Sequence, residues 1–109
     1  MDRLFSVRVQ PAGAAVAIEI RGDLDMFTAS RLETALAAIA PAATALIDLS
    51  ECDYVDSAGL HVLRTFARER GQDRVTLIVP AASPLRRVLE ITELDRYFRI
   101  APDRPQERG

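Results

Sequence analysis

The chain of 109 residues contains no lysine, since all 14 of its basic residues are arginine. This absence excludes Schiff-base catalysis by a lysine and the lysine of a phosphate-binding P-loop. The single cysteine, Cys52, cannot form an internal disulfide. The single histidine, His61, has no second histidine with which to build a metal site. We therefore expect no catalytic residues, no cofactor and no bound metal.

Strong positive charge and long apolar runs are also missing. The net charge is −2, and no basic stripe of the kind that binds nucleic acid is present. No apolar stretch approaches the roughly 20 residues needed to span a bilayer, and residues 1–4 do not begin a signal peptide. We expect a cytoplasmic protein without membrane insertion. Because 49% of the residues are hydrophobic, the chain can bury one core.

Four segments have the pattern of β-strands. Polar and apolar residues alternate over 5–9 and again over 16–20, and the turn residues 11–13 between them predict a β-hairpin. Apolar runs of strand length follow at 44–50 and 75–79. Two strands followed by alternating helix and strand imply an α/β fold with one mixed sheet, in which 44–79 forms a parallel crossover.

Three helices are predicted between and after these strands. The first is capped by Thr28 or Ser30 and ended by Pro41. The second covers 58–70, and the third begins after the cap residue Ser83, which a proline follows. In the second helix we expect Leu60, Leu63, Phe66 and Ala67 to face the core.

The end of the chain is the least regular part. Leu94 and Phe98 indicate a last helical turn, and the polar, proline-containing segment 102–109 is expected to be a flexible tail. The domain is therefore expected to cover residues 1–101.

A serine stands at the beginning of the second helix, in the segment Asp56-Ser57-Ala58-Gly59-Leu60. Ser57 is the best candidate for the N-cap, because its hydroxyl can accept a hydrogen bond from the first turn. A helix N-terminus also favours an anion. A phosphate on Ser57 would therefore leave the helix intact and change the charge of the surface.

Acidic residues are expected around this hydroxyl. In open sheets, binding groups lie beyond the carboxyl ends of the strands, where Asp23, Asp25, Asp56 and Ser57 all belong. The four residues can form one acidic patch around one hydroxyl.

The chain resembles the STAS domain family and, within it, the anti-sigma factor antagonists. Four segments in order carry the resemblance: 22–29 with Gly-Asp-Leu-Asp, 46–50, 55–60 with the serine, and 86–98. It implies a single STAS-like domain with a mixed four- to five-stranded sheet and helices packed mainly on one face.

The resemblance also implies a function. The unphosphorylated protein would bind an anti-sigma factor that is also a serine kinase, and so release the sigma factor. The kinase would phosphorylate Ser57 and end the binding, and a phosphatase would restore it. The identity of these partners and the oligomeric state stay open. The implied partner-binding residues are Asp23, Asp25, Phe27, Thr28, Asp56, Ser57, Ala58, Gly59 and His61.

Several alternatives remain beside this interpretation. Phe27 is either an exposed interface anchor or a staple packed under the first helix. Asp48, within a strand, is expected to be a structural hydrogen-bonding residue. A serine hydrolase lacks support because the Gly-x-Ser-x-Gly motif is missing. A STAS scaffold or adaptor, in a stress-signalling or lipid-transport complex without sigma-factor control, is the main rival function.

Overall fold

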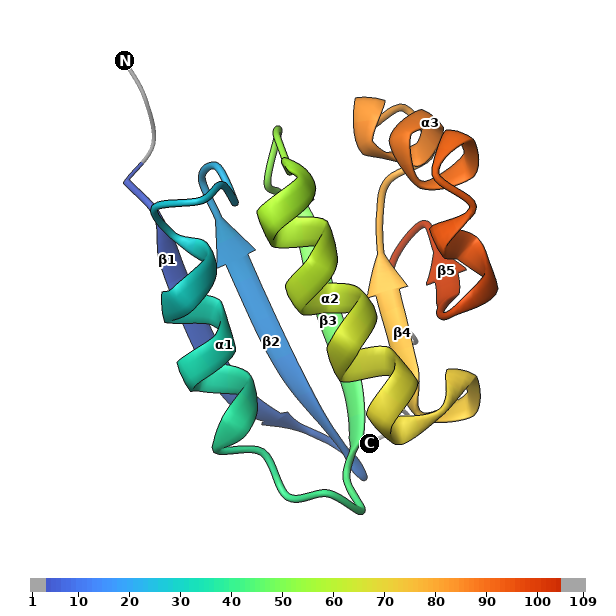
Figure 1. Cartoon of the computed structure of the whole chain (residues 1–109). Helices are drawn as coiled ribbons and strands as arrows, with labels where there is room; N and C mark the ends of the chain where they lie inside the picture. Colours follow the sequence, from blue (N-terminus) through green and yellow to red (C-terminus); the bar gives the residue numbers. More distant parts are fainter. Residues whose placement is uncertain (1–3, 105–109) are drawn as a thin grey trace.

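A mixed sheet of five strands organises the computed structural model, which describes residues 4–104 (Figure 1). The strands stand in the sheet in their order along the chain. The first pair is antiparallel and the other three pairs are parallel, so the predicted α/β fold with one mixed sheet is confirmed. The strands are β1 (Ser6–Ala12), β2 (Ala15–Arg21), β3 (Thr44–Glu51), β4 (Val75–Ile78) and β5 (Arg99–Ala101).

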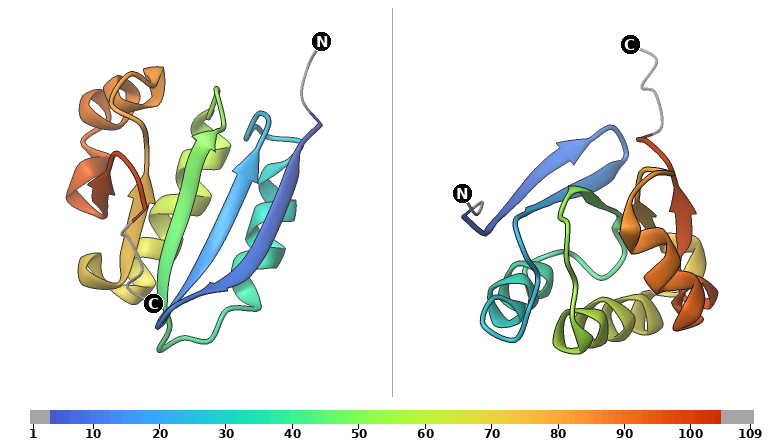
Figure 2. Two further views of the ribbon diagram at one scale, coloured as in Figure 1. Left: turned by 180° about the vertical axis from the view of Figure 1, so that it is seen from behind. Right: turned by 90° about the horizontal axis from the view of Figure 1, so that it is seen from above.

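Each parallel connection contains one helix: α1 (Ala29–Ala37), α2 (Ser57–Arg70) and α3 (Pro84–Ile91). The views from behind and from above show α1 and α2 on one face of the sheet (Figure 2). Gly71 ends α2 with a φ of 93°, and the Ser83 hydroxyl caps α3 by accepting from the Leu85 N–H at 3.2 Å. The three predicted helices are confirmed. No helix in the range 4–104 is long and apolar enough to cross a membrane.

The hydrophobic core fills the space between the sheet and the helices. In β3, the alternate residues Ala45, Ile47 and Leu49 are buried, as the period of a strand requires. Helices α1 and α2 cover them with side chains at helical spacing. These helix residues are Leu32, Leu36, Val62, Leu63, Phe66 and Ala67.

The opposite face of the sheet is polar and is tied to the chain's last described residue. Arg104 pairs with Glu19 of β2 and donates from Nε to the Asp48 carboxylate of β3 at 2.8 Å. Burial raises the pKa of Asp48, but hydrogen bonds from Ser50 and Arg104 outweigh it and hold that pKa below its usual value. Asp48 therefore has the structural role expected of it. Of the tail expected to be flexible, residues 105–109 lie outside the described residues.

Two details of the core differ from the sequence prediction. Leu94 does begin a short 3₁₀ turn, η2 (Leu94–Arg96), but Phe98 is buried just before β5, which was not predicted as a strand. Leu60 is only half-buried. Because α2 begins at Ser57, its buried stripe passes through Gly59 and Val62, and Leu60 lies at the margin of that stripe.

Candidate functional site

Two loops meet at the carboxyl edge of the sheet. Residues 22–28 follow β2, and residues 52–56 follow β3. The Leu24 N–H donates to the Tyr54 carbonyl at 2.9 Å, and the Asp56 N–H donates to the Leu24 carbonyl at 3.0 Å. Leu24 thereby forms a parallel bridge with Val55 beyond the ends of the strands. We call these two loops, together with residues 57–61 of α2, the serine surface.

Asp56 is the N-cap of α2. Its Oδ1 accepts hydrogen bonds from the N–H groups of Ala58 at 2.9 Å and Gly59 at 3.1 Å. The prediction that Ser57 is the cap is therefore wrong. Asp56 has the extended backbone of a cap, whereas Ser57 is already the first helical residue. A carboxylate also gains from the positive end of the helix dipole, which a hydroxyl does not.

The same carboxylate fastens the two loops together. Its second oxygen, Oδ2, accepts from the Met26 N–H at 3.0 Å. Asp56 thus holds the beginning of α2 with one oxygen and the loop after β2 with the other. The two loops cannot separate without loss of a charge-assisted hydrogen bond, which is about twice as strong as a neutral one.

Ser57 is exposed at this edge, directly after the cap. Among residues 4–104, no hydrogen bond involves its hydroxyl, since the capping bonds are made by Asp56. The backbone of the first helical turn fixes the position of the Ser57 Cβ, while the hydroxyl itself has no bonding partner among the described residues. The hydroxyl is therefore free to donate, to accept or to be modified.

Asp25 and Thr28 form a closed turn before α1. The Asp25 carboxylate accepts from the N–H groups of Phe27 at 2.9 Å and Thr28 at 3.1 Å. The Thr28 hydroxyl accepts from the Asp25 N–H at 2.9 Å and contacts the Asp23 carbonyl at the same distance. Thr28 stands at the cap position of α1 but makes no capping bond. The hydrogen bonds of the Asp25 carboxylate and the Thr28 hydroxyl fix the conformation of the loop. Few of their hydrogen-bonding positions therefore remain for a partner protein.

Gly59 is buried, although it was expected in the partner-binding set. A Cβ added to Gly59 would lie 2.7 Å from the Leu24 Cγ and 2.9 Å from the Leu24 carbonyl oxygen. Since real Cβ atoms do not approach so closely, only glycine lets α2 pack against this loop. Gly59 therefore allows close packing of α2 against the loop, and its burial leaves little of its surface for a partner.

Large apolar side chains are exposed on the same surface. The exposed fractions are 80% for Phe27, 69% for Met26 and 53% for Tyr54. Phe27 is therefore not packed under α1, and the staple interpretation is wrong. Tyr54 was not predicted from the sequence, because it lies in a turn-like segment between Asp53 and Asp56 and has no pattern of its own. Exposed aromatic and methionine side chains are typical of protein interfaces.

The remaining predicted residues differ in their exposure to solvent. Asp23 and His61 are exposed, and Ala58 is half-buried. Residues 4–104 contain no cluster of three or more metal-ligating side chains. Burial raises the pKa of the Cys52 thiol to about 11, so the thiolate that would act as a nucleophile is scarce at neutral pH.

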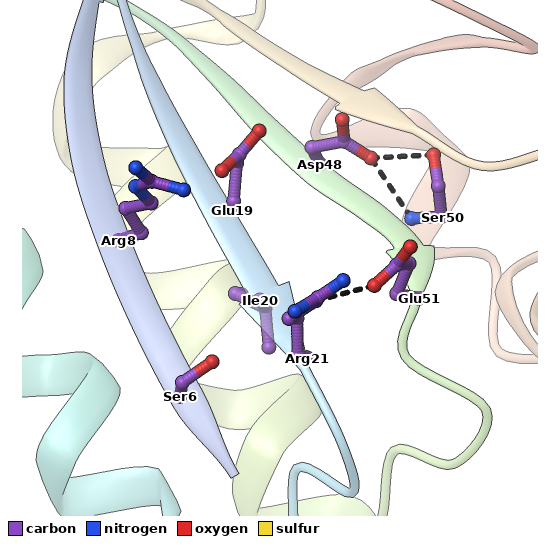
Figure 3. A pocket seen from close by; sticks show the side chains of 8 residues that line it. All are labelled: Ser6, Arg8, Glu19, Ile20, Arg21, Asp48, Ser50 and Glu51. Atoms are coloured by element: carbon purple, nitrogen blue, oxygen red, sulfur yellow. Dashed lines mark hydrogen bonds and ion pairs between the residues drawn. The ribbon is translucent and has the colours of Figure 1, made fainter. Parts of the chain in front are cut away.

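A larger hollow of about 540 Å³ lies on the polar face of the sheet (Figure 3). Most of its charged groups are paired, since Arg104 also binds Glu19 and Asp48. Arg21 pairs with Glu51, and the Asp48 carboxylate accepts from the Ser50 N–H at 2.9 Å. Arg8 points toward the same space from β1. Because its acids and bases largely satisfy each other, this hollow is a weaker candidate than the serine surface.

Comparisons with known proteins agree on one family. The family model described as "Mlab, STAS domain" matches residues 7–101. The anti-sigma-F factor antagonist RsfB of Mycobacterium tuberculosis is 33% identical over 98 residues, which cover 88% of this chain and 80% of RsfB.

Two solved structures have a fold similar to that of this chain. An anti-sigma factor antagonist from Mycobacterium paratuberculosis is 28% identical, with a TM-score of 0.76 over 92% of this chain and 87% of that chain. The phosphorylated form of SpoIIAA, a Bacillus cell fate determinant, is 20% identical, with a TM-score of 0.60 over 90% of this chain and 91% of that chain. At that identity, the likeness to SpoIIAA concerns the fold alone.

Replacement of Asp56 by alanine should destabilise the protein, because three N–H groups lose their acceptor. We expect the free energy of unfolding to fall by about 1–2 kcal/mol, the usual cost of a lost helix cap. Urea denaturation followed by circular dichroism measures it. The matched control is Asp53→Ala, since Asp53 is exposed in the same loop and makes no hydrogen bond among the described residues. Equal stability of the two variants would contradict the role of Asp56.

Proposed function

The chain belongs to the STAS domain family, and we propose that within this family it is an anti-sigma factor antagonist controlled by phosphorylation of Ser57. The unphosphorylated protein binds an anti-sigma factor that is also a serine kinase, and this binding releases the sigma factor. Phosphorylation by the kinase ends the binding, and a phosphatase restores it. The similarity to RsfB supports the general role.

One observation carries the part of the proposal that concerns Ser57. Its hydroxyl is exposed and makes no hydrogen bond among the described residues, although the carboxylate of the preceding Asp56 accepts three. Modification of a capping hydroxyl would alter the acceptor on which the end of the helix depends. Because Asp56 is the cap, phosphorylation of Ser57 removes no interaction that stabilises the fold.

The transfer itself requires little of this chain. The Ser57 oxygen attacks the γ-phosphorus of ATP, a new O–P bond forms, and the bond to ADP breaks. The hydroxyl proton passes to a base of the kinase. The serine surface supplies a nucleophile at a fixed position, and the partner supplies the base, the metal ion and the nucleotide. The chain therefore acts as the substrate of an enzyme.

The effect of the phosphate follows from charge. Phosphoserine carries about −1.5 to −2 charges at pH 7, and it would stand beside the carboxylate of Asp56. A partner surface that accepts a neutral hydroxyl would have to desolvate this charge. A loss of only about 3 kcal/mol weakens binding more than a hundredfold. The switch thus needs no rearrangement of the sheet.

Met26, Phe27 and Tyr54 supply the apolar contacts of the proposed interface. They project from the two loops that Asp56 joins, so they are presented on a fixed backbone. A preformed surface loses less conformational entropy on binding than a flexible one. Asp23, Ala58 and His61 complete the contact area around Ser57, while Asp25 and Thr28 support it from within.

The switch can be tested by mixing the protein with ATP and the candidate anti-sigma kinases of its own genome. We expect mass spectrometry to find one phosphate, on Ser57. We expect the unphosphorylated protein and Ser57→Ala to bind the kinase with similar affinity, and the phosphorylated protein to bind at least a hundredfold more weakly. Isothermal titration calorimetry measures all three.

Two outcomes would contradict the switch. One is a kinase that binds Ser57→Asp or the phosphorylated protein as tightly as the wild type. The other is a protein that binds no anti-sigma factor and is captured instead by subunits of a transporter, which would favour the adaptor function. An adaptor of that kind has no need of an exposed, unbonded hydroxyl.

Truncation of Phe27 should weaken the same complex. Because 80% of this residue is exposed, Phe27→Ala should leave the thermal stability unchanged while it lowers the affinity at least about tenfold. Val9→Ala is the control, since Val9 is a partly exposed apolar residue within β1 and away from the two loops. Equal binding by both variants would show that Phe27 lies outside the interface.

A further inference from the structure

A second, smaller hollow extends along α2 from Ser57. Its volume is about 260 Å³, and it lies between α2 and the end of α3 with the turn η2. Four of its residues come from α2 at helical spacing, and two close it from the other side. The residues are Ser57, Leu60, His61 and Arg64 of α2, together with Thr92 and Leu94.

Arg64 is the unusual member of this group. It is half-buried, and its Nε is fully covered and has no hydrogen-bond partner among the described residues. Two other partly buried arginines have acceptors: Arg70 donates to the Ile39 carbonyl at 2.8 Å, and Arg86 donates to the Val79 carbonyl at 2.9 Å. A buried donor without an acceptor is costly. Arg64 lines the hollow and makes no hydrogen bond or ion pair among the described residues, so the terminal N–H groups of its guanidinium have no acceptor either and can serve an anion there.

Helix geometry places Ser57 and Arg64 on one line. Seven residues advance a helix by about 10.5 Å and bring it back to within about 20° of the same direction. Helical side chains generally lean toward the N-terminus, a direction that would bring the long stem of Arg64 toward Ser57. His61 lies between them, one turn after the serine. Ser57 itself lines the hollow, so a phosphate on its hydroxyl would stand at the edge of that hollow.

We propose that Arg64 binds the phosphate of phospho-Ser57 on the protein's own surface, with His61 as a second donor. This inference rests on the proposed function, because it concerns the phosphorylated state of the same serine. A guanidinium can give two parallel N–H donors to phosphate oxygens, which a lysine cannot. The phosphate is then held between α2 and α3 in one orientation.

The charged groups around this phosphate are few. Asp56 precedes it on the chain, and the loop that holds Asp25 is fastened to Asp56. His61 and Arg64 line the hollow from α2; on the other side Thr92 and Leu94 are uncharged, and Glu93 between them is exposed and pairs with Arg96. Phosphorylation therefore changes the partner-binding surface in two ways: it adds negative charge, and it fills the hollow with an ordered Arg64 side chain.

The test uses full-length protein that carries phosphoserine at position 57 through genetic encoding, so that no kinase is needed. Phosphorus NMR follows the second ionisation of the phosphate with pH. Relative to the parent phosphoprotein, we expect Arg64→Gln to raise this pKa by about one unit, a tenfold change in proton affinity. Arg64→Lys should fall between the two, because it keeps the charge and loses the paired donors.

The matched control is Arg68→Gln. It removes the same charge from the same side of α2, but Arg68 is exposed and stands about 16.5 Å along the helix from Ser57, beyond reach of the phosphate. Equal shifts in the Arg64 and Arg68 variants, or no shift in either, would overturn the proposal. If Arg64→Gln does not fold, the Arg64 Nε–H signal decides: it must move on phosphorylation of the parent protein, and an unmoved signal refutes the contact.

The two proposals can fail separately. A kinase that never modifies Ser57 would refute the switch, while the encoded phosphoserine would still report on Arg64. If the phosphate does not bind Arg64, the switch would still operate through the negative charge of the phosphate.

Discussion

The carboxylate of Asp56 is the interaction on which the serine surface depends. One oxygen holds two N–H groups at the beginning of α2, and the other holds the Met26 N–H of the neighbouring loop. Close packing of Gly59 against Leu24 completes the same junction. The carboxyl edges of β2 and β3 are thereby combined into one surface. Three features of that surface follow: a free Ser57 hydroxyl, a fixed Phe27 and a preformed shape.

This arrangement separates the stability of the fold from the chemistry of the switch. The group that caps the helix is the carboxylate of Asp56, whereas the hydroxyl proposed to be modified makes no hydrogen bond that stabilises the fold. A phosphate can then be added and removed without unfolding of α2, and its charge acts on whatever docks there. Arg64, two turns further along the helix, is proposed to bind this phosphate within the same molecule.

The sequence was sufficient for the parts of the fold that local pattern controls. The alternation in β1 and β2, the apolar run of β3 and the glycine after α2 each predicted an element that the structure contains. It could not decide between Asp56 and Ser57 as the cap, because both residue types cap helices equally well. β5 has only three residues, too few for a periodic signal.

Other parts of the site depend on contacts between distant residues. Arg104 reaches Asp48 across 56 positions, and the burial of Gly59 depends on the conformation of Leu24 in another loop. The exposure of Phe27 depends on the turn closed by Asp25, which a hydrophobic pattern does not show. The Nε–H of Arg64 is buried without an acceptor in the packed structure, where Thr92 and Leu94 lie against α2. A sequence pattern does not show this packing.

The central claim is that the serine surface is already formed and that phosphorylation leaves its framework in place. Amide hydrogen exchange at Met26, Ala58 and Gly59, whose N–H groups all donate to Asp56, measures this most directly when the unphosphorylated and phosphorylated proteins are compared by NMR. The account predicts that all three amides stay protected in both forms. Loss of protection in the phosphorylated protein would show that the phosphate breaks the junction, and would contradict the account.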